Sequence, residues 1–205
     1  MAKLRSEGKI VLVVATSGID ALLLSSGRIA HSRFRIPLDI TEESTCDIKK
    51  GTQLAKLLKQ TTLIIWDKAP MANRYCFKAL DRTLKDILSK KVRSNTDRIF
   101  RGLTIALGDD FRQILPVIPK RKKPDIIQAC LSSSTLWKHV TVLRLTENMR
   151  LKTNLINPTE LDNLKTFDKC LLDIGEGMDV AEDESCIEIL EDLKIVNIIV
   201  MKKQL

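Results

Sequence analysis

Short apolar runs that alternate with helical patterns constrain the fold of this chain more than any other feature. The runs cover residues 10–15, 63–66, 103–107 and 140–145. Strands that alternate with helices form parallel sheets with crossover helices. We therefore expect an α/β fold in which the carboxyl ends of the strands meet at one edge of the sheet.

Polar side chains follow three of these runs, and ligands of open α/β sheets bind at the carboxyl ends of the strands. The first of these side chains is Asp67, which ends the run "LIIWD". The others follow the third and fourth runs: Asp109, Asp110, Glu147, Asn148 and Arg150. The sequence therefore predicts a functional site at this edge.

The segments between the runs have the apolar spacing of helices. In residues 71–90 the apolar side chains recur every three or four residues, a spacing typical of a face packed on a core and not of a cofactor site. Pro116 and Pro119 exclude a regular helix between them. Helices are expected at residues 19–26, 51–61, 71–90, 132–140 and around 167–172.

The charge of the chain is divided unequally. Residues 160–192 carry twelve acidic and two basic side chains, whereas residues 1–159 carry 29 basic and 14 acidic ones. The basic part is a candidate surface for a polyanion, and lysines that only solvate helix faces are the alternative. The run "KRKK" at residues 120–123 is interpreted as an exposed charge run, with a nuclear localisation signal as the other reading.

Cysteine and apolar content exclude several classes of protein. The five cysteines are odd in number, far apart and without a C-x-x-C pair, so a disulfide framework or zinc site is not expected and an intracellular compartment is favoured. The two histidines are too few for a metal cluster. Because no apolar run approaches the roughly 20 residues of a membrane span, we expect no membrane partner.

Four motifs together resemble a known family. In chain order they are "AHSRF", "LIIWDKAPM", "GDDFRQILPV" and "LRLTENMRL", and they closely resemble the Pif-type helicases of superfamily 1, in particular the Helitron-helicase-like proteins of plants. The resemblance extends from about residue 8 to residue 191. It implies a RecA-like P-loop NTPase core and ATP-driven, magnesium-dependent, 5′-to-3′ unwinding of DNA.

The resemblance also implies roles for single residues. Asp67 would hold Mg²⁺ through water, Gln113 would sense the γ-phosphate of ATP, and Arg150 would stabilise the charge of phosphoryl transfer. Contacts to single-stranded DNA would come from "VATSG" and "AHSRF", and the candidates are Thr16, Ser17, Gly18, His31, Ser32 and Phe34. An ordinary packed loop is the alternative for His31 and Phe34. By resemblance the protein would act in DNA repair, recombination and telomere maintenance in the nucleus, with the mitochondrion as the other compartment.

This sequence departs from the family pattern at three places. Lys68 stands where the family has the glutamate that acts as general base, and a protonated lysine cannot accept a proton. Asp109 adds a carboxylate where the family has glycine. No G-x-x-x-x-G-K-[ST] loop occurs in the 205 residues, so no nest of amides for phosphates is visible.

These departures lead to a specific expectation about the chain. Residues 1–151 would be a partial first RecA-like domain without its N-terminal strand and phosphate-binding loop, and residues 152–205 an acidic linker towards a second motor domain. The chain would be a fragment of a helicase and inactive by itself. A missing strand between "LTIALG" and "VTVLRL" would leave both neighbours unpaired.

Two other functions fit the same residues. The first is a non-catalytic DNA-binding or helicase-interacting module that retains the basic surface. The second is an α/β nucleotide-binding protein that does not bind DNA, and the strand-contact motifs argue against it.

Overall fold

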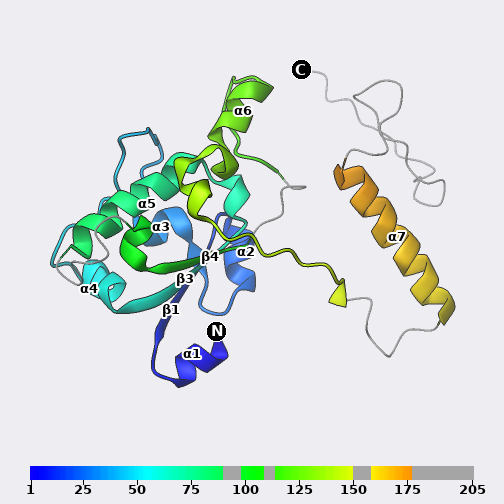
Figure 1. Cartoon of the computed structure of the whole chain (residues 1–205), viewed down its shortest axis with the longest axis horizontal. Helices are drawn as coiled ribbons and strands as arrows, with labels where there is room; N and C mark the ends of the chain where they lie inside the picture. The colour runs from blue at the N-terminus through cyan, green and yellow to red at the C-terminus, as the bar shows by residue number, and fades with distance from the viewer. Residues whose placement is uncertain (90–97, 109–113, 150–157, 177–205) are drawn as a thin grey trace, which may run out of the picture. The chain divides into compact units, whose positions relative to one another are not determined.

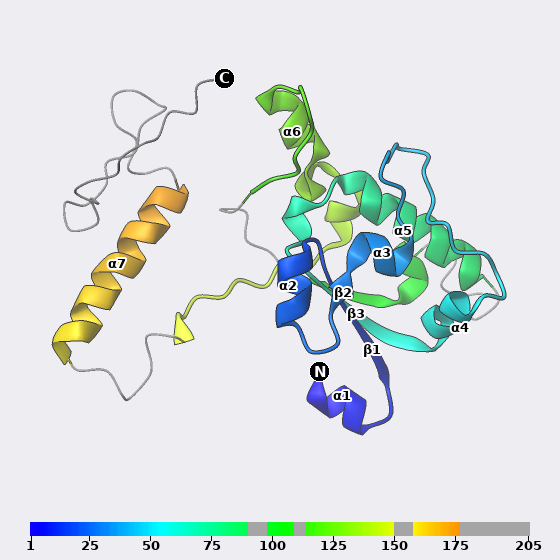
Figure 2. The same cartoon turned by 180° about the vertical axis from the view of Figure 1, so that it is seen from behind.

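The computed structural model describes residues 1–89, 98–108, 114–149 and 158–176. They belong to two compact units, which meet in the sequence between Val142 and Leu143, and each unit is described here by itself. Figures 1 and 2 show the first unit as a sheet with helices around it. In the second unit the structure describes one long helix, α7 (Pro158–Glu176). The division expected at residue 151 stays a prediction.

In the residues that the structure describes, the sheet of the first unit has four strands, all parallel, in the order β2-β1-β3-β4. The strands are β1 (Ile10–Ala15), β2 (Arg28–Ile29), β3 (Thr61–Asp67) and β4 (Thr104–Leu107). The predicted α/β class is therefore confirmed. Only β2 has no counterpart among the predicted strands, because two residues are too few to show an alternating pattern.

Helices and 3₁₀ turns connect the strands, and the helices predicted at residues 51–61 and 71–90 are present. The helices of the first unit are α1 (Ala2–Ser6), α2 (Gly18–Leu23), α3 (Ala30–Phe34), α4 (Gln53–Gln60), α5 (Arg74–Ile87) and α6 (Lys123–Ala129). The 3₁₀ turns cover Ala69–Met71, Ile99–Gly102, Leu131–Ser133 and Thr135–His139. No helix in the described ranges is long and apolar enough to span a membrane.

Side-chain caps fix where the two best-defined helices begin. The Thr52 hydroxyl accepts the Ala55 N–H at 3.3 Å, and the Asn73 side-chain oxygen accepts the Tyr75 N–H at 2.9 Å. Such caps satisfy backbone donors that have no partner inside the helix. They fix the first turns of α4 and α5, the helices before and after β3.

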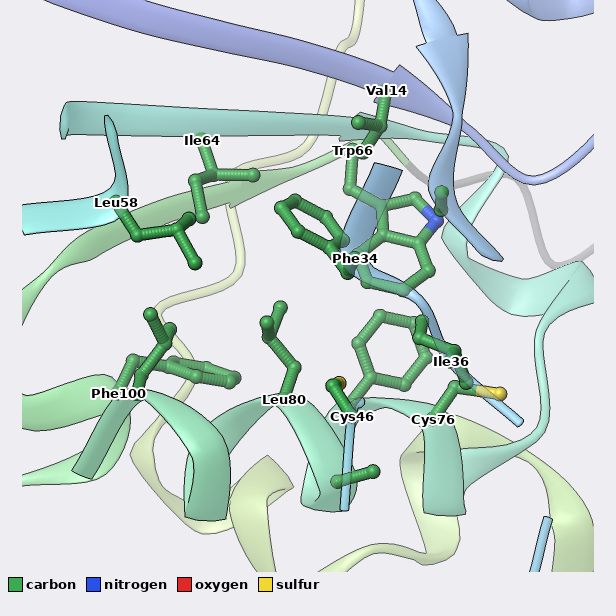
Figure 3. Packing of buried hydrophobic residues seen from close by; sticks show 14 of the residues in the cluster. Val14, Phe34, Ile36, Cys46, Leu58, Ile64, Trp66, Cys76, Leu80 and Phe100 are labelled. Carbon is green, nitrogen blue, oxygen red and sulfur yellow. The ribbon is translucent and has the colours of Figure 1, made fainter. Parts of the chain in front are cut away.

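The core is built around Trp66, which is fully buried. Its ring centroid lies 5.9 Å from that of Phe34 and 4.5 Å from that of Phe77. Figure 3 shows Phe34 beside Trp66, with Val14 on β1 and Ile64 on β3, the strand of Trp66. Burial of these large rings stabilises the folded unit.

The strand predicted at residues 140–150 is wrong for the residues that the structure describes. Residues 140–148 form no strand, and Leu143 and Leu145 are 87% and 100% exposed. The physical reason is that a strand needs a neighbour to pair its backbone groups. In the described part of the chain, β4 is an edge strand that pairs only with β3.

The unpaired edge of β4 leads to a prediction about association. An open strand edge is a template for pairing with a second chain, and a lysine on that edge prevents such pairing. We expect the 205-residue chain to associate at micromolar concentration, and Ala106→Lys, at an exposed position of β4, to shift it towards the monomer. Sedimentation velocity measures this.

The matched control for this prediction is Thr62→Lys. It adds the same charge at an exposed position of the interior strand β3. A monomeric unmodified chain, or equal effects of the two substitutions, would show that association does not use this edge.

The buried thiols lead to a second prediction. Burial raises the pKa of Cys46 to about 11 and that of Cys76 to about 12. The unfolded chain ionises near pH 9 while the folded core keeps both thiols neutral, so stability is complete below pH 9 and is lost as pH rises towards 12. Between pH 8 and 10.5 we expect a loss of at least about 2 kcal/mol, measured by urea unfolding.

Substitution of the buried thiols isolates this effect. A variant with both Cys46→Ala and Cys76→Ala should lose less stability over this pH interval than the unmodified chain. Cys170, which is only partly buried in the second unit, supplies the control Cys170→Ala. Equal alkaline losses in all three proteins would assign the effect to other groups.

Candidate functional site

The carboxyl ends of β1, β3 and β4 meet at one edge of the sheet, as the sequence predicts. In the register of the sheet Ala15 lies opposite Asp67, and Trp66 lies opposite Leu107. Backbone hydrogen bonds continue this pairing beyond the strands. The Thr16 N–H donates to the Asp67 carbonyl at 3.2 Å.

The segment after β4 is bound to the segment after β3 in the same way. The Gly108 N–H donates to the Trp66 carbonyl at 2.8 Å, and the Ala69 N–H donates to the Gly108 carbonyl at 3.0 Å. Three segments that are far apart in the sequence are thereby held around Asp67.

The Thr16 hydroxyl connects this edge to the core. It accepts the indole N–H of Trp66 at 3.0 Å and donates to the Lys68 carbonyl at 2.7 Å. Lys68 has a left-handed backbone conformation, with φ 53° and ψ 41°, which costs energy for a residue with a Cβ. The hydrogen bond from Thr16 therefore helps to hold the turn that directly follows Asp67.

Gly108 is required by its close approach to Asp67. A Cβ on Gly108 would lie 2.6 Å from the Asp67 Oδ1 and 3.3 Å from the Asp67 Cα. Any side chain at this position would push the carboxylate away or open the two strands. The glycine thus fixes the place of the carboxylate at the edge.

The chemistry of this edge fits one of the two groups that the resemblance implies. Mg²⁺ prefers carboxylate oxygens and keeps several waters, so a single aspartate such as Asp67 can hold it through water. No group of three or more metal-ligating side chains occurs in the described residues, and none is needed for this mode. The triphosphate of ATP does not fit equally well, because the 205 residues contain no phosphate-binding loop whose backbone amides would bind the phosphates.

The segment proposed to grip DNA is mainly used to build the fold. The Thr16 N–H and hydroxyl are both bonded inside the protein. Ser17 caps α2, because its hydroxyl accepts the Asp20 N–H at 3.2 Å and also contacts the Asp20 carboxylate. Gly18, at the start of α2, is exposed and is the member of the trio that is open to a ligand.

The motif "AHSRF" forms α3, and its three candidate DNA-contact residues lie in different environments. Ser32 is exposed, while His31 is half-buried, with its Nε2 3.7 Å from the Cys76 Sγ. Burial lowers the pKa of His31, so the ring is neutral near pH 7. Phe34 is fully buried against Trp66, so the packed alternative is correct for this ring and a base cannot stack on it.

Several predicted residues lie outside the described ranges. They are Asp109, Asp110, Gln113 and Arg150. Glu147 and Asn148 are exposed, and the Asn148 amide donates to the Asp168 carboxylate of α7 at 2.8 Å. The residues that the structure brings together are thus Thr16, Asp67 and Lys68.

Sequence reasoning missed three features of this region. The first two are the hydroxyl link of Thr16 and the close approach of Gly108, whose only sequence signal is a glycine directly after a strand. The third is a pair of cations, Arg28 before the α3 motif and Arg33 within it. Burial lowers the pKa of Arg33, and the nearby guanidinium of Arg28 lowers it further.

A parallel sheet with its candidate site at the carboxyl edge is the arrangement of RecA-like ATPase cores. Comparison with known families gives a match to the PIF1-like helicases over residues 1–185. The chain therefore belongs to the PIF1-like helicase family. No curated protein matches the chain.

Solved structures of Pif1 helicases have the same fold. Bacteroides Pif1 bound to ssDNA has a TM-score of 0.60 at 22% identity over 89% of this chain. Pif1 from Bacteroides in complex with ADP-AlF3 and ssDNA has a TM-score of 0.65 at 23% identity over 88%, and Pif1 from Candida albicans 0.59 at 22% over 90%. The predicted RecA-like core is confirmed by these matches. The chain spans 40%, 39% and 37% of those three proteins.

The Thr16 link generates a prediction about stability. Thr16→Val removes the hydroxyl and leaves the Trp66 indole N–H without its acceptor, which costs about 1–3 kcal/mol. Urea unfolding followed by Trp fluorescence should show this loss. The control is Thr62→Val, an equal change at an exposed position of β3, which should stay within about 0.5 kcal/mol of the unmodified chain. Equal stability of the two variants would contradict the link.

Proposed function

We propose that these 205 residues form part of the first RecA-like motor domain of a DNA helicase that couples ATP hydrolysis to 5′-to-3′ unwinding. The observation that supports this most directly is the convergence of Thr16, Asp67 and Gly108 at the carboxyl edge of a parallel sheet in a chain of the PIF1-like helicase family. That edge is where open α/β sheets bind their ligands. The solved relatives bound to single-stranded DNA and to ADP-AlF3 support DNA and nucleotide as the ligands.

In this proposal the catalytic parts have separate roles. Asp67 holds Mg²⁺ through water, Gln113 senses the γ-phosphate, and Arg150 stabilises the negative charge that phosphoryl transfer spreads over the equatorial oxygens. Magnesium, when bound, neutralises part of the phosphate charge. Asp67 is held for this role by the backbone bonds to Thr16 and by the space that Gly108 leaves.

We propose further that the 205 residues by themselves bind DNA but do not hydrolyse ATP. Lys68 occupies the position of the general base, and the sequence contains no phosphate-binding loop. The Thr16 hydroxyl holds the Lys68 backbone carbonyl, so the turn that carries Lys68 is fixed directly after Asp67. This observation favours the second candidate function, a non-catalytic DNA-binding or helicase-interacting module.

The DNA contact in this proposal lies on α2 and α3. Gly18 and Ser32 are exposed there, and Arg28 and Arg33 add two cations. Neither arginine takes part in an ion pair among the described residues. Phosphate groups of a single strand would relieve the repulsion between these arginines. A role in DNA repair, recombination or telomere maintenance, in the nucleus, follows from the resemblance and is part of this proposal.

The catalytic part of the proposal is tested by phosphate release. We expect the chain, with ATP, Mg²⁺ and single-stranded DNA, to release no more phosphate than its Asp67→Ala variant. Lys68→Glu should stay equally inactive, because catalytic groups that act as a unit are not restored singly. Fluorescence anisotropy with a labelled single strand should still show salt-dependent binding.

Two results would contradict this function. DNA-stimulated phosphate release that Asp67→Ala abolishes would show that the chain is an active ATPase. Absence of any DNA binding at low salt, in a sample with a cooperative unfolding transition, would favour the nucleotide-binding alternative without DNA.

A further inference from the structure

Four consecutive cations form an exposed segment that the proposed site does not use. They are Lys120, Arg121, Lys122 and Lys123, and they are called the basic tip here. All four are exposed, and Lys123 is the first residue of α6. Figures 1 and 2 show α6 standing clear of the sheet in opposite views.

Within the described ranges, no carboxylate forms an ion pair with the basic tip. Residues 114–142 contain five lysines and arginines but only one acid, Asp125. The Asp125 carboxylate accepts the backbone N–H of Lys122 at 3.3 Å, so it caps the start of α6 and forms no ion pair with a tip cation.

The backbone holds the basic tip in a defined turn. The Arg121 N–H donates to the Ile118 carbonyl at 3.3 Å, which places Pro119 and Lys120 at the two central positions. Lys120 has a φ of 59°, a conformation that a turn with proline at its first central position usually gives to glycine. A lysine at this position is uncommon, and the turn holds the backbone of Lys120 in one defined conformation.

We propose that the basic tip binds the phosphates of a nucleic-acid strand, as a second contact on elements other than those that build the carboxyl edge. The inference rests on the proposed function, since DNA is the polyanion which that function supplies. Exposed cations without internal partners gain free energy when they release counterions from a phosphate chain. The contact is independent of base sequence, because the tip offers charge and no aromatic ring or amide side chain.

The test compares two triple variants of the 205-residue chain. The tip variant carries Lys120→Gln, Arg121→Gln and Lys122→Gln. The control variant carries Lys3→Gln, Lys49→Gln and Lys56→Gln, which remove the same charge at exposed positions without ion pairs among the described residues. Binding of a fluorescent single strand is measured over a range of salt concentrations by anisotropy.

The expected result is that the DNA affinity of the tip variant depends less steeply on salt than that of the control variant. Three phosphate contacts on a single strand contribute about 2 to the slope of log affinity against log salt, so the tip variant should lose about this much and bind all base sequences more weakly. The control variant should change the slope by less than about 1. Equal losses in the two variants, or an unchanged tip variant, would overturn the proposal.

A second measurement locates the contact without any substitution. Acetylation of lysines with and without DNA, followed by mass spectrometry, should show that Lys120, Lys122 and Lys123 are protected by DNA while Lys3 and Lys56 are not. Equal protection of all five would overturn the proposal.

A nuclear-import assay tests the alternative reading of the basic tip as a targeting signal. If the tip variant binds DNA as the unmodified chain does but a fluorescent protein fused to it fails to enter the nucleus, the run is a targeting signal and the proposal is wrong.

One further variant separates this inference from the proposed function. Ser32→Glu places a carboxylate on the exposed face of α3, in the DNA contact proposed at the edge. If Ser32→Glu leaves DNA binding unchanged while the tip variant removes it, the DNA contact proposed on α2 and α3 is wrong and the contact proposed for the basic tip is supported. If Ser32→Glu removes binding and the tip variant does not, the inference about the tip fails alone. Absence of binding to any strand overturns both.

Discussion

The hydrogen bonds of the Thr16 hydroxyl are the interaction on which the candidate site depends. This single group accepts from the indole of Trp66 and donates to the carbonyl of Lys68. Trp66 is the centre of the core, and Lys68 is the first residue after the carboxylate that the site needs. Packing of the core is thereby transmitted to the turn that presents Asp67, over a path of two hydrogen bonds.

This arrangement explains why the fold and the chemistry of the site can change separately. The turn at Lys68 is held through its backbone carbonyl, which is the same in a lysine and in a glutamate. A change of side chain at this position therefore leaves the geometry of Asp67 in place while it replaces an acceptor of protons by a cation. The fold shared with the solved Pif1 helicases therefore does not by itself require a glutamate at this position.

Sequence reasoning succeeded where a pattern depends on neighbours along the chain. The runs that became β1 and β3, and the apolar stripe that became the buried face of α5, are local periodicities whose partners are present. It failed for residues 140–148, because strand formation also needs a pairing partner, and in the described residues β4 pairs only with β3. The same limit applies to Phe34: its motif gives the residue type, but only the packing against Trp66 shows that the ring is not available to a ligand.

In the candidate site, the sequence predicts where a functional group lies but not which residues make room for it. That a carboxylate stands at the carboxyl edge follows from "LIIWD" alone, since the end of a parallel strand is defined by its apolar run. A Cβ on Gly108 would lie only 2.6 Å from the Asp67 Oδ1, so this glycine leaves the space for the carboxylate. The close approach depends on the register of β3 and β4, which the sequence does not show. Residues that hold a functional group in place are therefore harder to find than the group itself, because their side chains carry no chemistry of their own and act only through the distance that the sheet imposes.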